Sequence, residues 1–252
     1  MIKFQHISKH FNGKIVLDDV SGHFDRSKVN LVIGPSGTGK SVLVKCIIGL
    51  IQPDQGAIDF DGRDILQGDR NVIVGIRREI GMLFQGSALF DSKTVEENVR
   101  FPLDMLTTMP KSEKLDRVNF CLKRVGLTNM NKKLSTELSG GMKKRVGIAR
   151  AIVNNSKYLF CDEPNSGLDP KTALLIDELI KELTYEYEIT TVVVTHDMDS
   201  VVTMGDYILF LDQGKKAWEG KSEDIFHAQV QALNEFLFAS KLMRLVREKT
   251  LQ

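Results

Sequence analysis

The sequence predicts an α/β fold in which a parallel sheet carries helices and one helical subdomain is inserted. Short apolar, β-rich runs alternate with helical patterns through most of the 252 residues, which is the order typical of parallel sheets. One glycine-rich turn joins such a run directly to an apolar helix. The stretch 92–155 is mostly helical and interrupts the alternation, so it is interpreted as the insertion.

The strands and the first helix are predicted from the length of their apolar runs and from the turns that flank them. Short apolar or β-branched runs between turn signals are typical of buried strands. The expected elements are strands at Val29–Ile33, Ile80–Phe84, Tyr158–Cys161 and Thr190–Val194, and a helix from about Lys40 to Leu50.

A further helix is expected after Asp169, which can cap it, and Pro170, which suits its first position. Leu175, Leu179 and Leu183 recur along this helix and are expected to form its buried face.

The last part of the chain combines a hairpin signal with a helical stripe. The turn residues 212–215 predict a hairpin between Tyr207–Leu211 and Lys215–Trp218. Four apolar side chains are then predicted to share one face of a helix: Phe226, Val230, Leu233 and Leu237.

The composition is that of a soluble globular protein, with 42% hydrophobic and 27% charged residues. Lys plus Arg (34) nearly balance Asp plus Glu (33), which disfavours nucleic acid or anionic lipid as a partner. No apolar run approaches the ~20 residues that span a bilayer, and no signal peptide is recognised. The three cysteines are expected to be buried in a protein of a reducing compartment: Cys46, Cys121 and Cys161.

The glycine-rich turn satisfies the pattern of a phosphate-binding loop between a strand and a helix. Its amides and the start of the helix are expected to bind phosphate oxygens. Lys40 would contribute a charge to the β- and γ-phosphates, and Ser41 a hydroxyl to Mg²⁺. The loop consists of Gly34, Pro35, Ser36, Gly37, Thr38, Gly39, Lys40 and Ser41.

Two carboxylates end the strand at Tyr158–Cys161. Asp162 is expected to hold Mg²⁺, usually through water. Glu163 points another way and can polarise the water that attacks the γ-phosphate. Without the phosphate loop, the same pair would read as an acidic helix cap.

A third motif, Ser139, Gly140 and Gly141, precedes an apolar helical pattern and forms a second candidate anion site. Two alternatives stay open. The three residues can be a plain helix cap, and the basic run Lys143–Arg145 can be a solvated face.

Taken together, these residues resemble the nucleotide-binding subunits of ABC transporters, over roughly Ile2 to Gly220 and in that family's motif order. Leu138–Met142 match the signature motif, with Met142 where many members have Gln. The remaining matches are Gln85 (glutamine loop), Ser166–Asp169 (D-loop), His196 (switch histidine) and Phe11 (adenine-stacking aromatic, more often Tyr). Read singly, Phe11 can be a core residue, Gln85 a surface residue and His196 a strand end.

The resemblance implies a P-loop NTPase (RecA-like) parallel sheet core with an N-terminal antiparallel β subdomain and an inserted helical subdomain. It implies a single ABC ATPase domain over 1–252. Within it, the α/β core covers 1–91 and 156–222, the helical subdomain 92–155, and a C-terminal helical tail 223–252.

The resemblance also implies a mechanism with ATP and Mg²⁺ as cofactors. Two copies would pack head to tail, and the signature motif of one would face the ATP on the P-loop of the other. Glu163 would be the base, with His196 on the γ-phosphate and Gln85 sensing Mg²⁺ and the attacking water. The implied metal set is Ser41, Gln85 and Asp162, and the nucleotide set is Phe11, Gly34–Ser41 and Ser139–Gly141.

Membrane permease subunits are the implied partners, which would place the chain in the cytoplasm, peripheral on the inner membrane. Leu89, Phe90, Val99 and Phe101 are expected to line a groove for a permease helix; alternatively, they form the helical subdomain's own core. The tail, with Lys241, Arg244 and Arg247, can dock a regulatory subunit or the second copy, or simply pack on its own domain.

The segments 86–103 and 138–150 look like those of Mla-type (MCE-associated) phospholipid transport ATPases. This resemblance implies phospholipid transport between bacterial membranes and a periplasmic lipid-binding protein as a partner. An importer of an amino acid or another small solute is the alternative. ABC proteins acting on ribosomes or DNA, and small-molecule kinases, fit the chain length, charge and signature motif less well.

Overall fold

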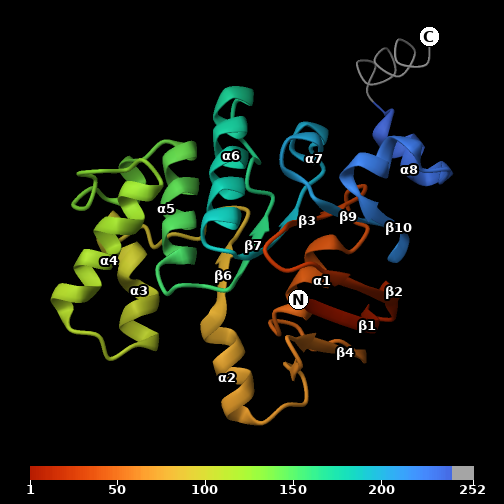
Figure 1. The fold of residues 1–252 in the computed structure, drawn as a ribbon, viewed down its shortest axis with the longest axis horizontal. Coiled ribbons are helices and arrows are strands. Elements are labelled where there is room, and N and C mark those ends of the chain that lie inside the picture. Colours follow the sequence, from red (N-terminus) through yellow and green to blue (C-terminus); the bar gives the residue numbers. More distant parts are fainter. Residues whose placement is uncertain (240–252) are drawn as a thin grey trace.

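The computed structural model describes residues 1–239, which form two sheets and the helices packed on them (Figure 1). The smaller sheet is antiparallel, with strand order β2-β1-β4-β5. It confirms the predicted N-terminal antiparallel subdomain. Its strands are β1 (Ile2–Phe11), β2 (Lys14–Phe24), β4 (Gln55–Phe60) and β5 (Arg63–Asp64).

The larger sheet has the order β10-β9-β3-β8-β7-β6 and is parallel except for β10. The carboxyl ends of its parallel strands therefore meet at one edge, where open α/β sheets bind ligands. Its strands are β3 (Val29–Ile33), β6 (Ile80–Leu83), β7 (Tyr158–Asp162), β8 (Thr190–Val194), β9 (Tyr207–Asp212) and β10 (Lys215–Lys221). The predicted hairpin is β9–β10.

The helices are spread along the long axis of the molecule. Figure 1 shows α3, α4 and α5 together at one end of the long axis, whereas α1 lies toward the other. The helices are α1 (Lys40–Ile47), α2 (Arg70–Glu79), α3 (Val95–Leu106), α4 (Lys111–Arg124), α5 (Gly140–Ile152), α6 (Pro170–Glu186), α7 (Met198–Met204) and α8 (Gln231–Leu237), with 3₁₀ turns at Ser135–Glu137 and Ser222–His227.

Successive side chains of a strand point to opposite faces, so the large sheet contributes to two cores. On β7, Leu159 and Cys161 pack in the core that includes the helical insertion. Tyr158 and Phe160 pack in the core with α1 and the small sheet. The large sheet is thereby buried on both faces, and only its edge remains for polar chemistry.

Two predictions about apolar stripes are wrong in part. Leu175 is 42% exposed, and the buried face of α6 instead contains Ile176, Leu179, Ile180 and Leu183. A stripe at spacings of three and four follows the 3.6-residue turn better than repeated steps of four. Phe226 lies in a 3₁₀ turn and is exposed, and Val230 precedes α8, so only Leu233 and Leu237 share that helix's buried face.

Other features of the chain agree with the composition. Cys46, Cys121 and Cys161 are all buried, and burial raises the pKa of the first two thiols to about 11. Within residues 1–239, no helix combines the length and apolarity that a membrane span needs. The basic residues Lys241, Arg244 and Arg247 lie outside the described residues.

Candidate active site

The glycine-rich turn wraps closely between β3 and α1 because two of its glycines have contacts that no side chain would allow. Gly34 has φ 144°, and a Cβ there would lie 2.1 Å from the carbonyl oxygen of Leu211. Gly39 has φ 98°, and its Cβ would lie 2.7 Å from the carbonyl oxygen of Val16. The turn therefore requires glycine at both positions.

Lys40 reaches back into this loop from the first turn of α1. Its ammonium donates to the carbonyl oxygens of Gly34 and Pro35, both at 2.8 Å. Burial lowers the pKa of Lys40, and the nearby carboxylates Glu163 and Asp162 oppose that shift. The lysine is thus a buried cation in the mouth of the loop.

The loop fits a phosphate group. Four successive main-chain amides donate to no group within residues 1–239: Gly37, Thr38, Gly39 and Lys40. Free amides at the start of a helix, next to a lysine ammonium, form an anion-binding site.

Ser41 and Asp162 face each other across the space between α1 and the end of β7. The Ser41 hydroxyl donates to Asp162 Oδ1 at 3.0 Å. Burial raises the pKa of Asp162, the Ser41 hydrogen bond lowers it and Glu163 raises it further. Hydroxyl and carboxylate oxygens are the ligands that Mg²⁺ prefers, so the pair fits that ion.

Glu163 brings the three predicted catalytic residues together. Its amide donates to the Val194 carbonyl at 2.9 Å, and its φ of 47° turns the chain away from the direction of β7. Glu163 Oε2 accepts from Gln85 Nε2 at 2.7 Å, and Oε1 lies 3.2 Å from His196 Nδ1. Gln85 contacts Glu163 rather than Ser41 or Asp162, so its predicted place on the metal is not formed here.

The Ser139 motif lies apart from this cluster, at the start of α5. Ser139 caps the helix and accepts from the Met142 amide at 3.4 Å. A Cβ at Gly141 would lie 2.6 Å from Thr172 Cγ2, so the glycine permits α5 to pack closely on α6. Figure 1 shows α5 well separated from α1.

Phe11 ends β1 and is 42% exposed, which excludes a core role for its side chain. The Lys9 ammonium lies 5.4 Å from the ring centroid. An exposed ring is what a stacking role would need, and that role stays a prediction.

Two of the three basic residues after the signature make contacts within the protein instead of forming a solvated face. Lys144 is buried, with its ammonium on the carbonyl oxygens of Gln85 and Glu163. Arg145 donates to the carbonyl of Val125. The sequence singled out neither contact, because burial of a lysine by distant segments leaves no local signal.

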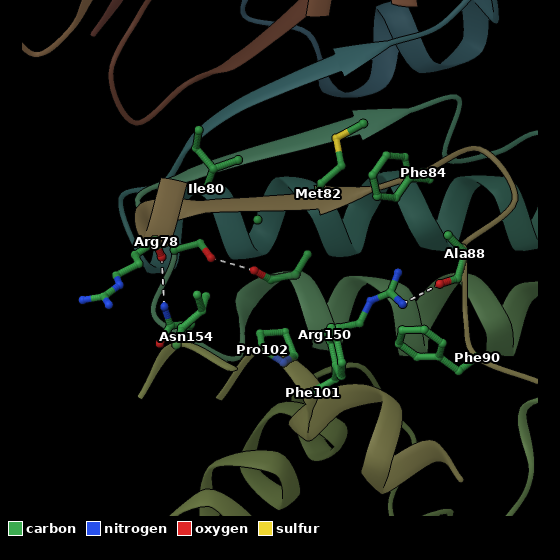
Figure 2. A pocket seen from close by; sticks show the side chains of 14 residues that line it. Arg78, Ile80, Met82, Phe84, Ala88, Phe90, Phe101, Pro102, Arg150 and Asn154 are labelled. Atoms are coloured by element: carbon green, nitrogen blue, oxygen red, sulfur yellow. Dashed lines mark hydrogen bonds between the residues drawn. The ribbon is translucent and has the colours of Figure 1, made fainter. Parts of the chain in front are cut away.

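A groove runs between β6 and α3 (Figure 2). Phe90 and Phe101 line it with ring centroids 4.9 Å apart. Val99 is fully buried in the core, and Leu89 packs against that core, so half of the predicted lining was wrong. Other lining residues are Arg78, Ile80, Met82, Phe84, Leu106 and Arg150.

A phosphate loop that faces an oxygen-ligand pair and a glutamate suited to orienting water is the arrangement of a P-loop nucleoside triphosphatase. When bound, ATP supplies the scissile phosphate and Mg²⁺ offsets its charge. Residues 17–166 match the family model described as ABC transporter. The chain belongs to this family and is an ATPase that uses ATP with Mg²⁺.

Two named relatives bear on the kind of transporter. The chain is 40% identical over 242 residues to the methionine import ATP-binding protein MetN of Pasteurella multocida, covering 94% of this chain and 70% of that protein. It is 36% identical over 236 residues to the probable ribonucleotide transport ATP-binding protein mkl of Mycobacterium leprae, covering 94% and 68%. Neither name mentions phospholipid, so the Mla-type prediction is not supported by them.

Solved structures agree on the fold. The dimeric structure of MJ0796, described as a bacterial ABC transporter cassette, has a TM-score of 0.80 at 33% identity, covering 88% of this chain and 99% of that one. The same cassette is known in a dimeric post-hydrolysis state bound to ADP and Pi. The structure of cbiO1 from Clostridium perfringens, part of the ABC transporter complex cbiONQ, has a TM-score of 0.82 at 30% identity, covering 98% of each chain.

Proposed function

We propose that two copies of this chain pack head to tail and share each ATP between the P-loop of one copy and the Ser139 motif of the other. The observation that carries this proposal is the placement of two anion-binding helix starts, at α1 and α5, far apart in one chain (Figure 1). The amides of Gly140 and Gly141 donate to no group within residues 1–239. The related cassette MJ0796 has a dimeric structure, which supports the pairing of two copies.

The charges favour this assembly. ATP carries about four negative charges, which two sets of amides, Lys40 and Mg²⁺ would offset. Removal of the γ-phosphate weakens the shared contact, so hydrolysis opens the dimer.

Each residue around Glu163 has its own task in this proposal. Glu163 orients the attacking water and accepts its proton. Gln85 and His196 hold the two carboxylate oxygens of Glu163 in the present geometry, and His196 turns toward the γ-phosphate in the closed dimer. Ser41 and Asp162 hold Mg²⁺, and Phe11 stacks on adenine.

Substitution of Glu163 tests the catalytic part. Glu163→Gln is expected to slow hydrolysis at least ~100-fold, because the amide cannot accept the proton. With ATP it is expected to accumulate as a dimer, measured by light scattering on a sizing column. Lys40→Ala is the matched control, because it loses ATP binding and stays monomeric. Hydrolysis by Glu163→Gln at the wild-type rate would remove Glu163 from its role.

The groove beside β6 is the proposed docking site for a cytoplasmic helix of a membrane permease. It combines the exposed rings of Phe90 and Phe101 with Arg78 at one end and Arg150 near its middle (Figure 2). Such a groove suits an amphipathic helix. The chain would then work in the cytoplasm on the inner membrane. Within the described part of the tail, residues 223–239, Ile225, Leu233 and Leu237 pack in the chain's own core, which leaves the exposed face for a regulatory subunit or the second copy.

The transported molecule is proposed to be an amino acid or another small solute, which the name of the MetN relative favours. Phospholipid is the second candidate, because the segments 86–103 and 138–150 resemble Mla-type ATPases. The complex purified from its own membrane and placed in liposomes decides between them. Methionine uptake coupled to hydrolysis supports the first candidate. ATP-dependent phospholipid transfer to an acceptor vesicle supports the second, with a periplasmic lipid-binding protein.

A further inference from the structure

Lys144 is the one residue of α5 whose side chain reaches two of the proposed catalytic residues. It lies five positions after Ser139 and is 4% exposed. Its ammonium donates to the carbonyl oxygen of Glu163 at 3.0 Å and, over a short contact, to that of Gln85. Within residues 1–239, it forms no salt bridge with a carboxylate side chain.

The two carbonyls meet at this point because of the sheet. β6 and β7 are parallel neighbours with Leu83 paired to Cys161. Gln85 and Glu163 each lie two residues beyond that pair, so the chains that leave the two strands are adjacent. A buried cation between them restrains their separation, because moving either carbonyl away would take from the buried ammonium one of its two acceptors.

This constraint acts directly on Gln85 and Glu163, which are called the catalytic pair below. Glu163 holds a left-handed φ of 47°, which a residue with a side chain rarely adopts without support from its surroundings. Its carboxylate accepts from the Gln85 side chain at 2.7 Å. Lys144 therefore holds the main chains of the two residues whose side chains contact each other.

A second basic residue of α5 holds the other end of the same loop. Arg150 donates to the carbonyl oxygens of Ser87 and Ala88, both at 2.6 Å, and Figure 2 shows the bond to Ala88 at the edge of the groove. Ser87 and Ala88 also have positive φ. The loop from Gln85 to Ala88 is thus fastened to α5 at both ends.

We propose that Lys144 is a positioning residue for hydrolysis, which links the helix that begins at the signature motif to Gln85 and Glu163 of its own copy. The inference rests on the proposed function. A shift of α5, when its first turn engages the ATP of the second copy, is passed through this ammonium to the catalytic pair. Lys144 contacts no reacting atom and acts only through main-chain oxygens.

The proposal is tested by the steady-state kinetics of Lys144→Met. This substitution keeps an apolar stem and removes the ammonium. We expect kcat to fall about 10- to 100-fold, because misplacement of a catalytic group by about 1 Å has such an effect. KM and the affinity for ATP with Mg²⁺ stay within a factor of about three, because the P-loop is untouched. Lys144→Arg keeps the donors and should recover part of kcat.

The matched control is Lys143→Met, which removes a neighbouring charge of the same helix and keeps wild-type kcat. Without nucleotide, hydrogen exchange of Lys144→Met should quicken at the turn amides of Ser87 and Ser166, which bond to Phe84 and Glu163. If Lys144→Met folds poorly, Lys144→Gln supplies the same comparison.

Two results would overturn the inference. One is a kcat of Lys144→Met within twofold of wild type. The other is an equal loss of ATP binding and hydrolysis, without recovery by arginine, which indicates a merely structural residue. Glu163→Gln in the same assay separates the two proposals: if it is inactive and Lys144→Met is not, only the Lys144 inference fails.

Discussion

Asp177 is a buried carboxylate whose surroundings favour its protonated form. It lies on α6, is 3% exposed and accepts from Asn165 Nδ2 at 2.8 Å. Burial, as the largest cause, raises its pKa to about 6; the hydrogen bonds of Ser200 and Asn165 lower it, and Asp197 and Asp199 raise it further. Asn165 lies just before the D-loop and Ser200 lies on α7. Hydrogen bonds to the Asp177 carboxylate therefore connect the segment that follows Glu163 to α7.

The raised pKa of Asp177 makes the folded protein less stable as the pH rises. The folded state prefers the protonated acid, so the contribution of Asp177 is fully present below pH 3.8 and is lost as the pH rises through about 6. Above that pH, the ionised side chain destabilises the fold by on the order of 3 kcal/mol, at 1.36 kcal/mol per pKa unit.

Asp177→Asn removes this ionisation and keeps an oxygen for Asn165. The variant should have a higher free energy of unfolding than wild type at pH 7.5, and about half of that advantage should disappear at pH 5. Urea unfolding at both pH values measures the difference. An advantage of equal size at both would show that Asp177 does not titrate in this range.

At the scale of elements, the sequence predicted the features that depend only on residues close together in the chain. The strand–loop–helix unit around Lys40 follows from glycine geometry and apolar runs, and β3 and β8 have their expected bounds. The meeting of Gln85, Glu163 and His196 was expected only through family resemblance, because it depends on the strand order. Lys144 and Asp177 were not predicted, since only tertiary burial gives a lysine or an aspartate such a setting.

The groove between β6 and α3 was predicted at half of its residues for the same reason. Phe101 faces outward on α3, whereas Val99, two positions earlier, faces the core. Sequence identifies both as apolar, and only the rotation of the helix decides which one a partner can contact.

Phe101→Asp tests this groove. A carboxylate there should expel an apolar helix from the groove, so the permease subunits purified from the membrane should lose this chain. Native mass spectrometry of the complex measures the subunit ratio. Phe120→Asp on α4, a similarly exposed ring that does not line the groove, is the control and should leave the ratio unchanged. Docking at this groove would be contradicted if both variants lost this chain from the complex equally, or if neither variant lost it.

At the scale of the whole molecule, the proposed head-to-tail dimer would make each site a joint product of two chains, because α1 and α5 are separated within one chain. A single copy carries one P-loop and one signature motif, and these two face different sites in a head-to-tail dimer. Damage to the P-loop of one copy and to the signature of the other therefore falls on the same site and leaves the second site intact.

Mixing two inactive variants exposes this arrangement. Lys40→Ala lacks the phosphate-binding cation, and Ser139→Arg blocks the signature helix start, so neither variant alone can form an intact site. A mixed dimer with one copy of each variant has one intact site, which joins the P-loop of the Ser139→Arg copy to the signature motif of the Lys40→Ala copy. The mixture should therefore hydrolyse ATP faster than either variant alone, at no more than about half of the wild-type rate if the sites act independently. Hydrolysis and retained ATP are measured at each mixing ratio. A mixture that neither hydrolyses nor retains more ATP than its separate components would mean that Ser139 does not act across the dimer.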